Sequence, residues 1–251
     1  MTWWLPLVAV AVGVLLGLLG GGGAILTVPI LTTLLGQTPA QATVGSLVIV
    51  GLSSLIGALG HLRSGRVRVT EGVVFGLLGI VGATIGSRLS TQVSGPVLMS
   101  AFSVLLVLVA GLMWRRRGAR TTESGTERGW LVRIAAATGV GLLTWFFGVG
   151  GGFVVVPALT LVLGLPMSAA VATSLLVVAI NSTSSLAVRA VSGLSLDWGV
   201  VLPFAVLAVV GTLFGSRLSP RIDQRRLQLA FIVLLLAVAA VVGIQNIPQL
   251  V

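Results

Sequence analysis

Two glycine-rich stretches decide how this chain folds: GGGGAILTVPILTTLL at residues 20–35 and GVGGGFVVVPALTLVL at residues 148–163. Their glycine clusters, prolines and trailing apolar residues coincide at a spacing of 128 residues, which pairs Pro29 with Pro157. A glycine cluster inside an apolar segment supplies unusual backbone dihedrals, and a proline removes a backbone donor, so both interrupt a regular helix. The chain therefore carries the same helix break twice.

The duplication extends beyond these two stretches. The spacing of 128 also pairs Ser46 with Ser174, and the sequence GSRLS at 86–90 returns at 215–219 with a spacing of 129. One net residue has thus been inserted in the second copy. Internal repeats with paired glycine- or proline-interrupted segments are typical of secondary transporters, and the interruptions indicate where the substrate binds.

The composition predicts an all-α polytopic membrane protein. Hydrophobic residues make up 56% of the 251 positions and charged residues only 8%, which a water-soluble fold of this length does not tolerate. Apolar segments long enough to cross the ~30 Å hydrocarbon core recur along the whole chain. They lie at 3–35, 40–60, 72–89, 97–114, 130–163, 169–191, 199–218 and 227–244.

The first segment of each half is too long for one crossing. A straight helix over residues 3–35 would span about 50 Å at ~1.5 Å per residue, well beyond the hydrocarbon core. We therefore expect each half to be a broken-helix hairpin followed by three transmembrane helices. We predict a first repeat over 1–114, a basic cytoplasmic linker over 115–129, and a second repeat over 130–251.

The basic residues, all of them arginines, favour inverted repeats. Short cytoplasmic loops collect arginine, so the linker is placed inside. Single crossings by the long segments would put Arg88, Arg217, Arg221, Arg225 and Arg226 outside, whereas hairpins leave only Arg88 and Arg189 there. Both termini then lie outside. Because the arginines flank apolar segments, membrane topology and anionic lipid headgroups explain the +10 net charge, and we expect no nucleic-acid partner.

The duplicated breaks, GGGGAILTVP and GVGGGFVVVP, each followed by a small-residue helix and separated by a basic linker, resemble the TauE/SafE family of sulfite exporters. This family is also called the four-toluene sulfonate uptake permeases, and the resemblance covers nearly the whole chain. It implies a carrier in the bacterial cytoplasmic (inner) membrane for sulfite, organosulfonates such as sulfoacetate, or related sulfur anions. It does not choose among these small anionic substrates.

The glycine turns are the first candidate substrate site. Short helices that begin near the membrane midplane present free backbone N–H groups and a positive dipole end, which suits an anion. The alternative is that the glycines only allow close helix packing, as expected for Gly82, Gly86, Gly211 and Gly215. The candidate substrate-binding glycines are Gly20, Gly21, Gly22, Gly23, Gly148, Gly150, Gly151 and Gly152.

Hydroxyl and amide side chains of the second segments extend this candidate site. They are Thr43, Ser46, Ser53, Thr173, Ser174 and Asn181, and the spacing of 128 places Ser53 opposite Asn181. Serine and threonine in membrane helices commonly bond their own backbone, which is the competing interpretation for each. Ser46 and Ser174 stand out because they match between repeats, and Asn181 because a buried amide is costly without partners.

His61 and Arg189 match at the ends of the second segments and are candidate gating or anion-attracting residues. The competing interpretation is that both are ordinary loop residues that end helices. The acidic residues Glu71, Glu123, Glu127, Asp197 and Asp223 all fall at segment ends or in the linker. A buried carboxylate is the usual proton or sodium carrier, so we expect no strongly coupled cation symport. An inside-negative potential already drives anions outward.

Other function classes fit less well. An intramembrane enzyme needs a nucleophile, a base and a metal or carboxylate at membrane depth, and the chain has one histidine and no cysteine. We therefore predict no enzyme, no cofactor and no metal site. A partner subunit or a channel for another small anion stays open, because the sequence does not separate a channel from a carrier. It also leaves the oligomeric state, the coupling ion and the direction of transport open.

Overall fold

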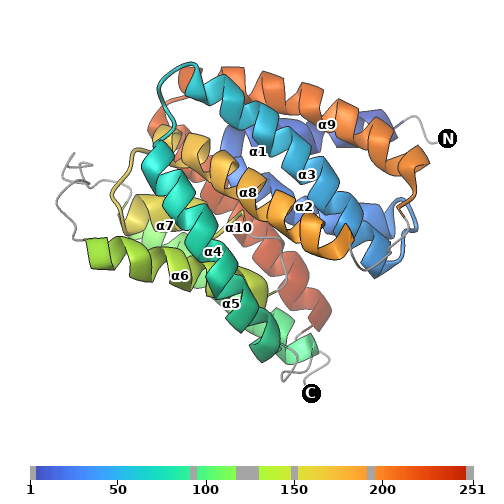
Figure 1. Ribbon diagram of the computed structural model, residues 1–251, viewed down its shortest axis with the longest axis horizontal. Coiled ribbons are helices and arrows are strands. Elements are labelled where there is room, and N and C mark those ends of the chain that lie inside the picture. Colours follow the sequence, from blue (N-terminus) through green and yellow to red (C-terminus); the bar gives the residue numbers. More distant parts are fainter. Residues whose placement is uncertain (1–3, 91–94, 117–129, 148–151, 191–195, 247–251) are drawn as a thin grey trace.

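The computed structural model describes residues 4–90, 95–116, 130–147, 152–190 and 196–246, and within these the chain is helical (Figure 1). The side chains of 39, 83–90, 95–96, 130, 132–133, 145, 188–190 and 245–246 are outside this description. The helices are α1 (Leu5–Leu19), η1 (Gly20–Gly23), α2 (Ala24–Thr33), α3 (Pro39–Leu62), α4 (Val69–Ser90), α5 (Gly95–Arg115), α6 (Trp130–Phe146), α7 (Val155–Leu161), α8 (Met167–Ala190), α9 (Trp198–Leu218), η3 (Ser219–Arg221) and α10 (Gln224–Asn246).

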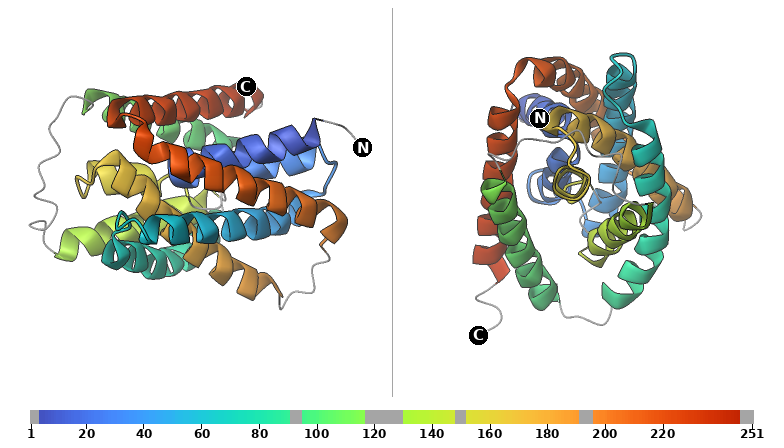
Figure 2. Two further views of the ribbon diagram at one scale, coloured as in Figure 1. Left: turned by 90° about the horizontal axis from the view of Figure 1, so that it is seen from above. Right: turned by 90° about the vertical axis from the view of Figure 1, so that its left-hand side faces the viewer.

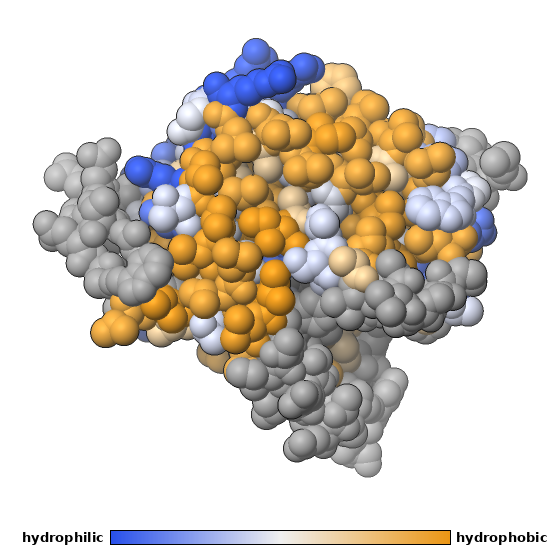
Figure 3. All heavy atoms as spheres, in the orientation of Figure 1, coloured by the Kyte–Doolittle hydropathy of each residue, from blue (hydrophilic) through white to orange (hydrophobic). Residues whose placement is uncertain are grey.

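The structure confirms an all-α polytopic membrane protein. Among the described residues, six helical runs are long and apolar enough to cross a membrane, and two shorter apolar helices accompany them. Large apolar side chains such as Leu131, Phe214 and Ile244 are 80%, 63% and 75% exposed, which suits a surface that faces lipid. Figure 3 shows this apolar surface over most of one face of the molecule.

The first long segment folds back on itself as a hairpin. Gly20 has φ +65°, a conformation that favours glycine, and it ends α1. Ala9 near the start of α1 and Leu31 near the end of α2 share one buried apolar cluster, so the two arms lie side by side. The glycines make the turn, whereas Pro29 lies inside α2 without ending it. Pro157 lies in the first turn of α7, where backbone N–H groups have no intrahelical partner to lose.

The helix pairings repeat when the two halves are exchanged. α1 packs on α9 as α4 packs on α6, and α2 packs on α3 as α7 packs on α8. α3 also packs on α9 as α4 packs on α8, while α3–α8 and α5–α10 each join equivalent helices of the two halves. Figure 2 shows the same elements from two further directions. This pattern is expected of a duplicated fold with a pseudo-two-fold axis.

The equivalent helices of the two halves run in opposite directions at both of these contacts. Gly51 of α3 faces Ser182 of α8 and Gly57 faces Leu175, so the residue numbers rise along one helix and fall along the other. The Ser103 hydroxyl of α5 donates to the Ala239 carbonyl of α10 (2.7 Å). The Gln228 amide at the start of α10 donates to the Met113 carbonyl near the end of α5 (2.9 Å). We keep inverted repeats, and the division at 1–114, 115–129 and 130–251, as our interpretation of this arrangement.

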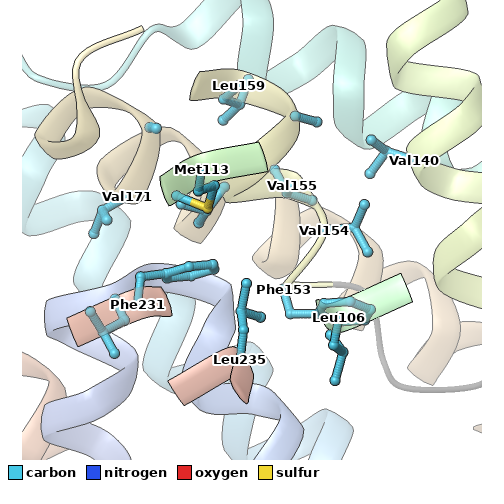
Figure 4. Close-up of a cluster of buried hydrophobic side chains, with 14 of the residues drawn as sticks. Leu106, Met113, Val140, Phe153, Val154, Val155, Leu159, Val171, Phe231 and Leu235 are labelled. Atoms are coloured by element: carbon cyan, nitrogen blue, oxygen red, sulfur yellow. The ribbon is translucent and has the colours of Figure 1, made fainter. Parts of the chain in front are cut away.

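A buried aromatic cluster fixes the second hairpin in the core. Phe153 directly follows the glycine at the hairpin tip, and its ring packs edge-on against Phe102 of α5 with centroids 5.1 Å apart. Figure 4 shows Phe153 among Leu106 of α5 and Phe231 and Leu235 of α10. Because these side chains are fully buried, the start of α7 is held between α5 and α10. This position brings the tip against the first hairpin.

Candidate functional site

The tips of the two hairpins meet in the interior of the protein. A Cβ atom built on Gly21 would collide with the backbone of Gly152, and one built on Gly152 would collide with the backbone of Gly21. Both residues are buried. Only glycine allows two backbones to approach this closely, so the sequence places glycines where the two halves touch.

A serine of α8 joins this contact. The Ser174 hydroxyl accepts a hydrogen bond from the Gly21 backbone N–H (3.3 Å) and donates one to the Val171 carbonyl (2.8 Å). A Cβ on Gly20 would collide with the same Ser174 oxygen. The predicted site residues Gly20, Gly21, Gly152 and Ser174 are therefore brought together, and one of the turn's backbone donors already has a partner.

The remaining predicted glycines fall into two groups. Gly22 faces the Phe231 ring, where an added Cβ would lie 3.0 Å from the nearest ring carbon, and Gly23 packs on the Leu16 backbone. These two glycines serve packing within the first half and against α10. Gly148, Gly150 and Gly151 lie outside the described residues. The packing predicted for Gly82, Gly211 and Gly215 is confirmed, because each faces the backbone of a neighbouring helix, whereas the side-chain position of Gly86 lies outside the description.

A group of uncharged polar side chains lies deeper along α3 and α8. Ser53 and Ser54 of α3 are fully buried, and Asn181 and Ser182 of α8 are 7% and 2% exposed. The hydroxyl oxygens of the three serines and the Asn181 Oδ1 have no hydrogen-bond partner among the described residues. These four residues, called the central polar group below, occupy repeat-matched positions. Buried polar atoms without partners cost about 1–3 kcal/mol each, so their retention favours a functional explanation.

Asn181 packs against a glycine of α4, where a larger residue would have little room. A Cβ on Gly79 of α4 would lie 3.3 Å from Asn181 Oδ1, and Gly141 of α6 packs directly on the Gly79 backbone. In the other half, the residue that matches Gly79 is Ala208, which packs on Gly13 of α1 in the same way. The α4–α6 and α1–α9 crossings are thus closely packed walls beside the central polar group.

The other predicted polar residues have local partners or stand apart. The Ser46 hydroxyl donates to the Thr43 carbonyl (2.8 Å) on its own helix, and Thr43 itself is half-buried. The Thr173 hydroxyl accepts from the Arg68 backbone N–H (3.1 Å), so it holds the turn before α4. Ser46 and Ser174 therefore differ in their described hydrogen-bond partners, although the spacing of 128 places them at equivalent positions.

The predicted gating residues and the described acidic residues lie at the ends of helices. His61 is 3% exposed near the end of α3, and its Nε2 atom has no hydrogen-bond partner among the described residues. The Arg189 side chain lies outside the description. Asp197 caps α9 by accepting from the Gly199 N–H (3.1 Å), and Asp223 accepts from the Arg225 N–H (3.3 Å). Both carboxylates are exposed and lie at helix ends, as expected.

Several buried polar side chains were not singled out by the sequence. Thr27 of α2 is fully buried, Thr144 of α6 is 2% exposed and Gln37 in the α2–α3 turn is 8% exposed, and none of their side-chain oxygens has a described partner. The signal that could have found them is a polar residue within or beside an apolar run. No group of three or more His, Asp or Glu residues that could hold a metal ion lies in the described part of the chain.

The arrangement suits weak, reversible binding of a small solute. The central polar group offers hydroxyls and an amide, and the hairpin tips offer a backbone contact about two helical turns away along α8. Neutral donors stabilise an anion without the deep energy well that a fixed buried cation would create. The described residues place no carboxylate among these groups, so the site carries dipoles rather than charge.

Comparison with known proteins identifies the family. The family model described as sulfite exporter TauE/SafE matches residues 5–242. The chain belongs to the TauE/SafE family. A protein of Xylella fastidiosa (strain 9a5c), named probable membrane transporter protein, is 32% identical over 236 residues, which cover 91% of this chain and 89% of that protein. The Bacillus subtilis (strain 168) probable membrane transporter protein YunE is 28% identical over 98% of this chain and 96% of its own length.

A third relative is less similar in sequence. The Methanocaldococcus jannaschii probable membrane transporter protein MJ0441 is 26% identical over 88% of this chain and 86% of its own length. No solved structure matches the chain. The family and these names are those of membrane transporters rather than enzymes, and they agree with the membrane-spanning helices. The protein is a multi-pass membrane transporter of this family.

Proposed function

We propose that this protein is a secondary carrier that exports small sulfur-containing anions across the bacterial cytoplasmic membrane. Sulfite is the first candidate substrate, and organosulfonates such as sulfoacetate are the next. The observation that carries the proposal is the central polar group, because Ser53, Ser54, Asn181 and Ser182 are buried without described partners between two equivalent helices. An oxyanion that passes between α3 and α8 would accept hydrogen bonds from the three unpartnered serine hydroxyls and from the Asn181 amide nitrogen.

The closed hairpin tips fit a carrier better than an open channel. The Gly21–Gly152 contact joins the two halves where the predicted path crosses the middle of the membrane. Rocking of one half against the other would separate these tips and expose the central polar group to each side in turn, as alternating access requires. A saturable flux with counter-transport therefore follows from this proposal.

The driving force needs no coupling ion. An inside-negative potential moves each anionic charge outward with about 2.3 kcal/mol per 100 mV. The described acidic residues lie at helix ends, so no described carboxylate is placed to carry a proton or sodium ion through the centre. A protonophore should therefore leave the flux unchanged when the membrane voltage is clamped.

The test is transport of labelled sulfite, and of labelled sulfonates in parallel, in proteoliposomes under an imposed potential. Wild-type protein should give saturable flux and counterflow, and the double variant Ser53→Ala/Asn181→Ala should lower the flux at least about tenfold, which corresponds to ~1.4 kcal/mol. Flux that survives this substitution would reject the central polar group as the site. Absence of wild-type flux with every anion would reject the substrate class, and flux that never saturates would indicate a channel.

A further inference from the structure

A pocket of ≈ 790 Å³ opens at one end of the molecule, outside the central site. It is lined by the end of α3 and the following turn from the first half, and by the end of α9 and η3 from the second half. Its polar lining residues are His61, Arg63, Ser64, Arg66, Ser216, Arg217 and Arg221. The pocket therefore forms only where the two halves come together.

The charge of this pocket is entirely positive. Its lining contains Arg63, Arg66, Arg217 and Arg221 and no acidic residue. Guanidinium groups bind oxyanions through two parallel N–H donors, and guanidinium groups gathered in a concave site favour an anion of at least two oxygens. The arginine side chains are exposed, whereas His61 is buried in the pocket wall with Nε2 unpartnered.

The pocket lining shares one face of α3 with Ser53 of the central polar group. Gly60 and Ile56 line the pocket at a spacing of four residues, and Ser53 lies three residues before Ile56. Residues three and four apart share a helix face, so Ser53 follows the pocket lining one turn deeper into the membrane. An anion that leaves the arginines along α3 would reach the unpaired Ser53 hydroxyl next.

Contacts at the helix ends place this pocket on the linker side of the protein. Gln228 at the start of α10 bonds the Met113 carbonyl, close to where α5 leads into the linker, and η3 precedes α10 directly. In Figure 3 a hydrophilic patch lies where the turn between α3 and α4 lies in Figure 1. Because arginine-rich linkers stay in the cytoplasm, the pocket faces the compartment from which an exporter takes its substrate.

We propose that the arginine pocket is a cytoplasmic anion-binding vestibule that captures the oxyanion before it moves between α3 and α8. This inference rests on the proposed transport of sulfur-containing anions. The chemistry that the pocket recognises is an oxyanion with two or more oxygens, which either the free substrate or the phosphate of an anionic lipid could supply. Local concentration of the anion by the arginines lowers the KM without acting on the translocation step.

The experiment measures equilibrium binding of labelled sulfite to the full-length protein in nanodiscs, which requires no transport. In nanodiscs of zwitterionic lipid only, wild type should bind sulfite, and Arg63→Gln/Arg217→Gln should weaken binding at least about tenfold. The matched control Arg225→Gln/Arg226→Gln removes two exposed arginines at the start of α10 that do not line the pocket, and it should bind as wild type does. Equal binding by all three proteins would overturn the vestibule.

A second arm separates the free anion from a lipid headgroup. Addition of phosphatidylglycerol to the nanodiscs should change wild-type sulfite binding by less than about twofold at 0.15 M salt, where exposed surface charge is largely screened. Loss of sulfite binding on that addition, restored by removal of the lipid, would mean that the pocket holds a lipid phosphate and would overturn its role for the substrate.

Flux distinguishes failure of this inference from failure of the proposed function. In proteoliposomes the Arg63→Gln/Arg217→Gln variant should raise the KM for sulfite at least about tenfold. Its kcat should stay within about twofold of wild type, because at saturating sulfite concentration the site fills without capture by the arginines. A fall in kcat with an unchanged KM would overturn the vestibule. Wild-type protein that binds sulfite in an arginine-dependent way but transports none would leave the pocket as an anion site and reject the export function.

Discussion

The arginine pocket and the central polar group handle charge in opposite ways. The pocket gathers four guanidinium groups on exposed side chains around an open cavity, while the centre holds only hydroxyls, an amide and glycine backbone. Water hydrates the arginines at the rim, so their charge is tolerated there, but a fixed cation at membrane depth would cost several kcal/mol and would retain an anion. This difference supports our proposal that the anion is captured by charge at the surface and passes neutral dipoles inside.

The two regions also differ in how they resist substitution. The pocket is built from flexible side chains at helix ends, whereas the centre depends on backbones that touch, as at Gly21 and Gly152. Changes at the rim should therefore alter affinity, as the arginine variants above test, and changes at the centre should alter flux or stability. The predictions below test the centre, from the largest expected effect to the smallest.

The largest effect is expected at the hairpin tips. Gly21→Ala places a methyl group against the Gly152 backbone, which cannot move aside without separating the two halves. Overpacking of this kind costs about 1–3 kcal/mol, and we expect sulfite flux to fall by about two orders of magnitude. The control Gly111→Ala lies on α5 with nothing within 4 Å of the added methyl group, and it should match wild type in flux and melting temperature. Normal flux in Gly21→Ala would show that the tips are not a functional contact.

A smaller effect with an opposite signature is expected at Asn181. Asn181→Ala removes the Nδ2 donor of the amide, so flux should fall about tenfold. Its Oδ1 is buried without a described partner, so the melting temperature should be unchanged or higher. Ser103→Ala serves as the inverse control, because its hydroxyl joins α5 to the α10 carbonyl of Ala239. That change should cost about 0.5–1.5 kcal/mol of stability and leave flux intact. Equal losses of flux and stability in Asn181→Ala would assign the amide to packing instead.

Much of the fold could be predicted from local sequence. The glycine clusters predicted the helix breaks because a turn needs local backbone conformations that favour glycine, such as φ +65° at Gly20. Apolar length marked the helices, and the boundaries at Pro39 and Asp197 follow from capping, since Thr38 and Asp197 accept backbone N–H groups at the first turns of α3 and α9. These signals require no knowledge of how the two halves dock.

The candidate site was less predictable because it depends on docking. The spacing of 128 relates Ser46 to Ser174 and Ser53 to Asn181, but it does not specify which residue of one half touches the other. Thr173 is adjacent to Ser174 yet bonds the Arg68 backbone, and only the three-dimensional register decides this. The arginine pocket was missed as a unit for the same reason, since Arg63 and Arg217 are far apart in sequence and meet only where α3 packs on α9.

The smallest effect is expected at Ser46, which the repeat makes equivalent to Ser174. Ser174→Ala removes the oxygen that accepts from the buried Gly21 N–H, so it should destabilise the protein by about 1–3 kcal/mol and lower flux with it. Ser46→Ala removes a hydroxyl whose one partner among the described residues is the Thr43 carbonyl of its own helix, and it should cost less than about 0.5 kcal/mol. Chemical unfolding in detergent micelles measures both differences. If the two variants lost the same stability, the contact between Ser174 and the first hairpin would contribute nothing, and the two halves would be held together by their glycine-lined crossings alone.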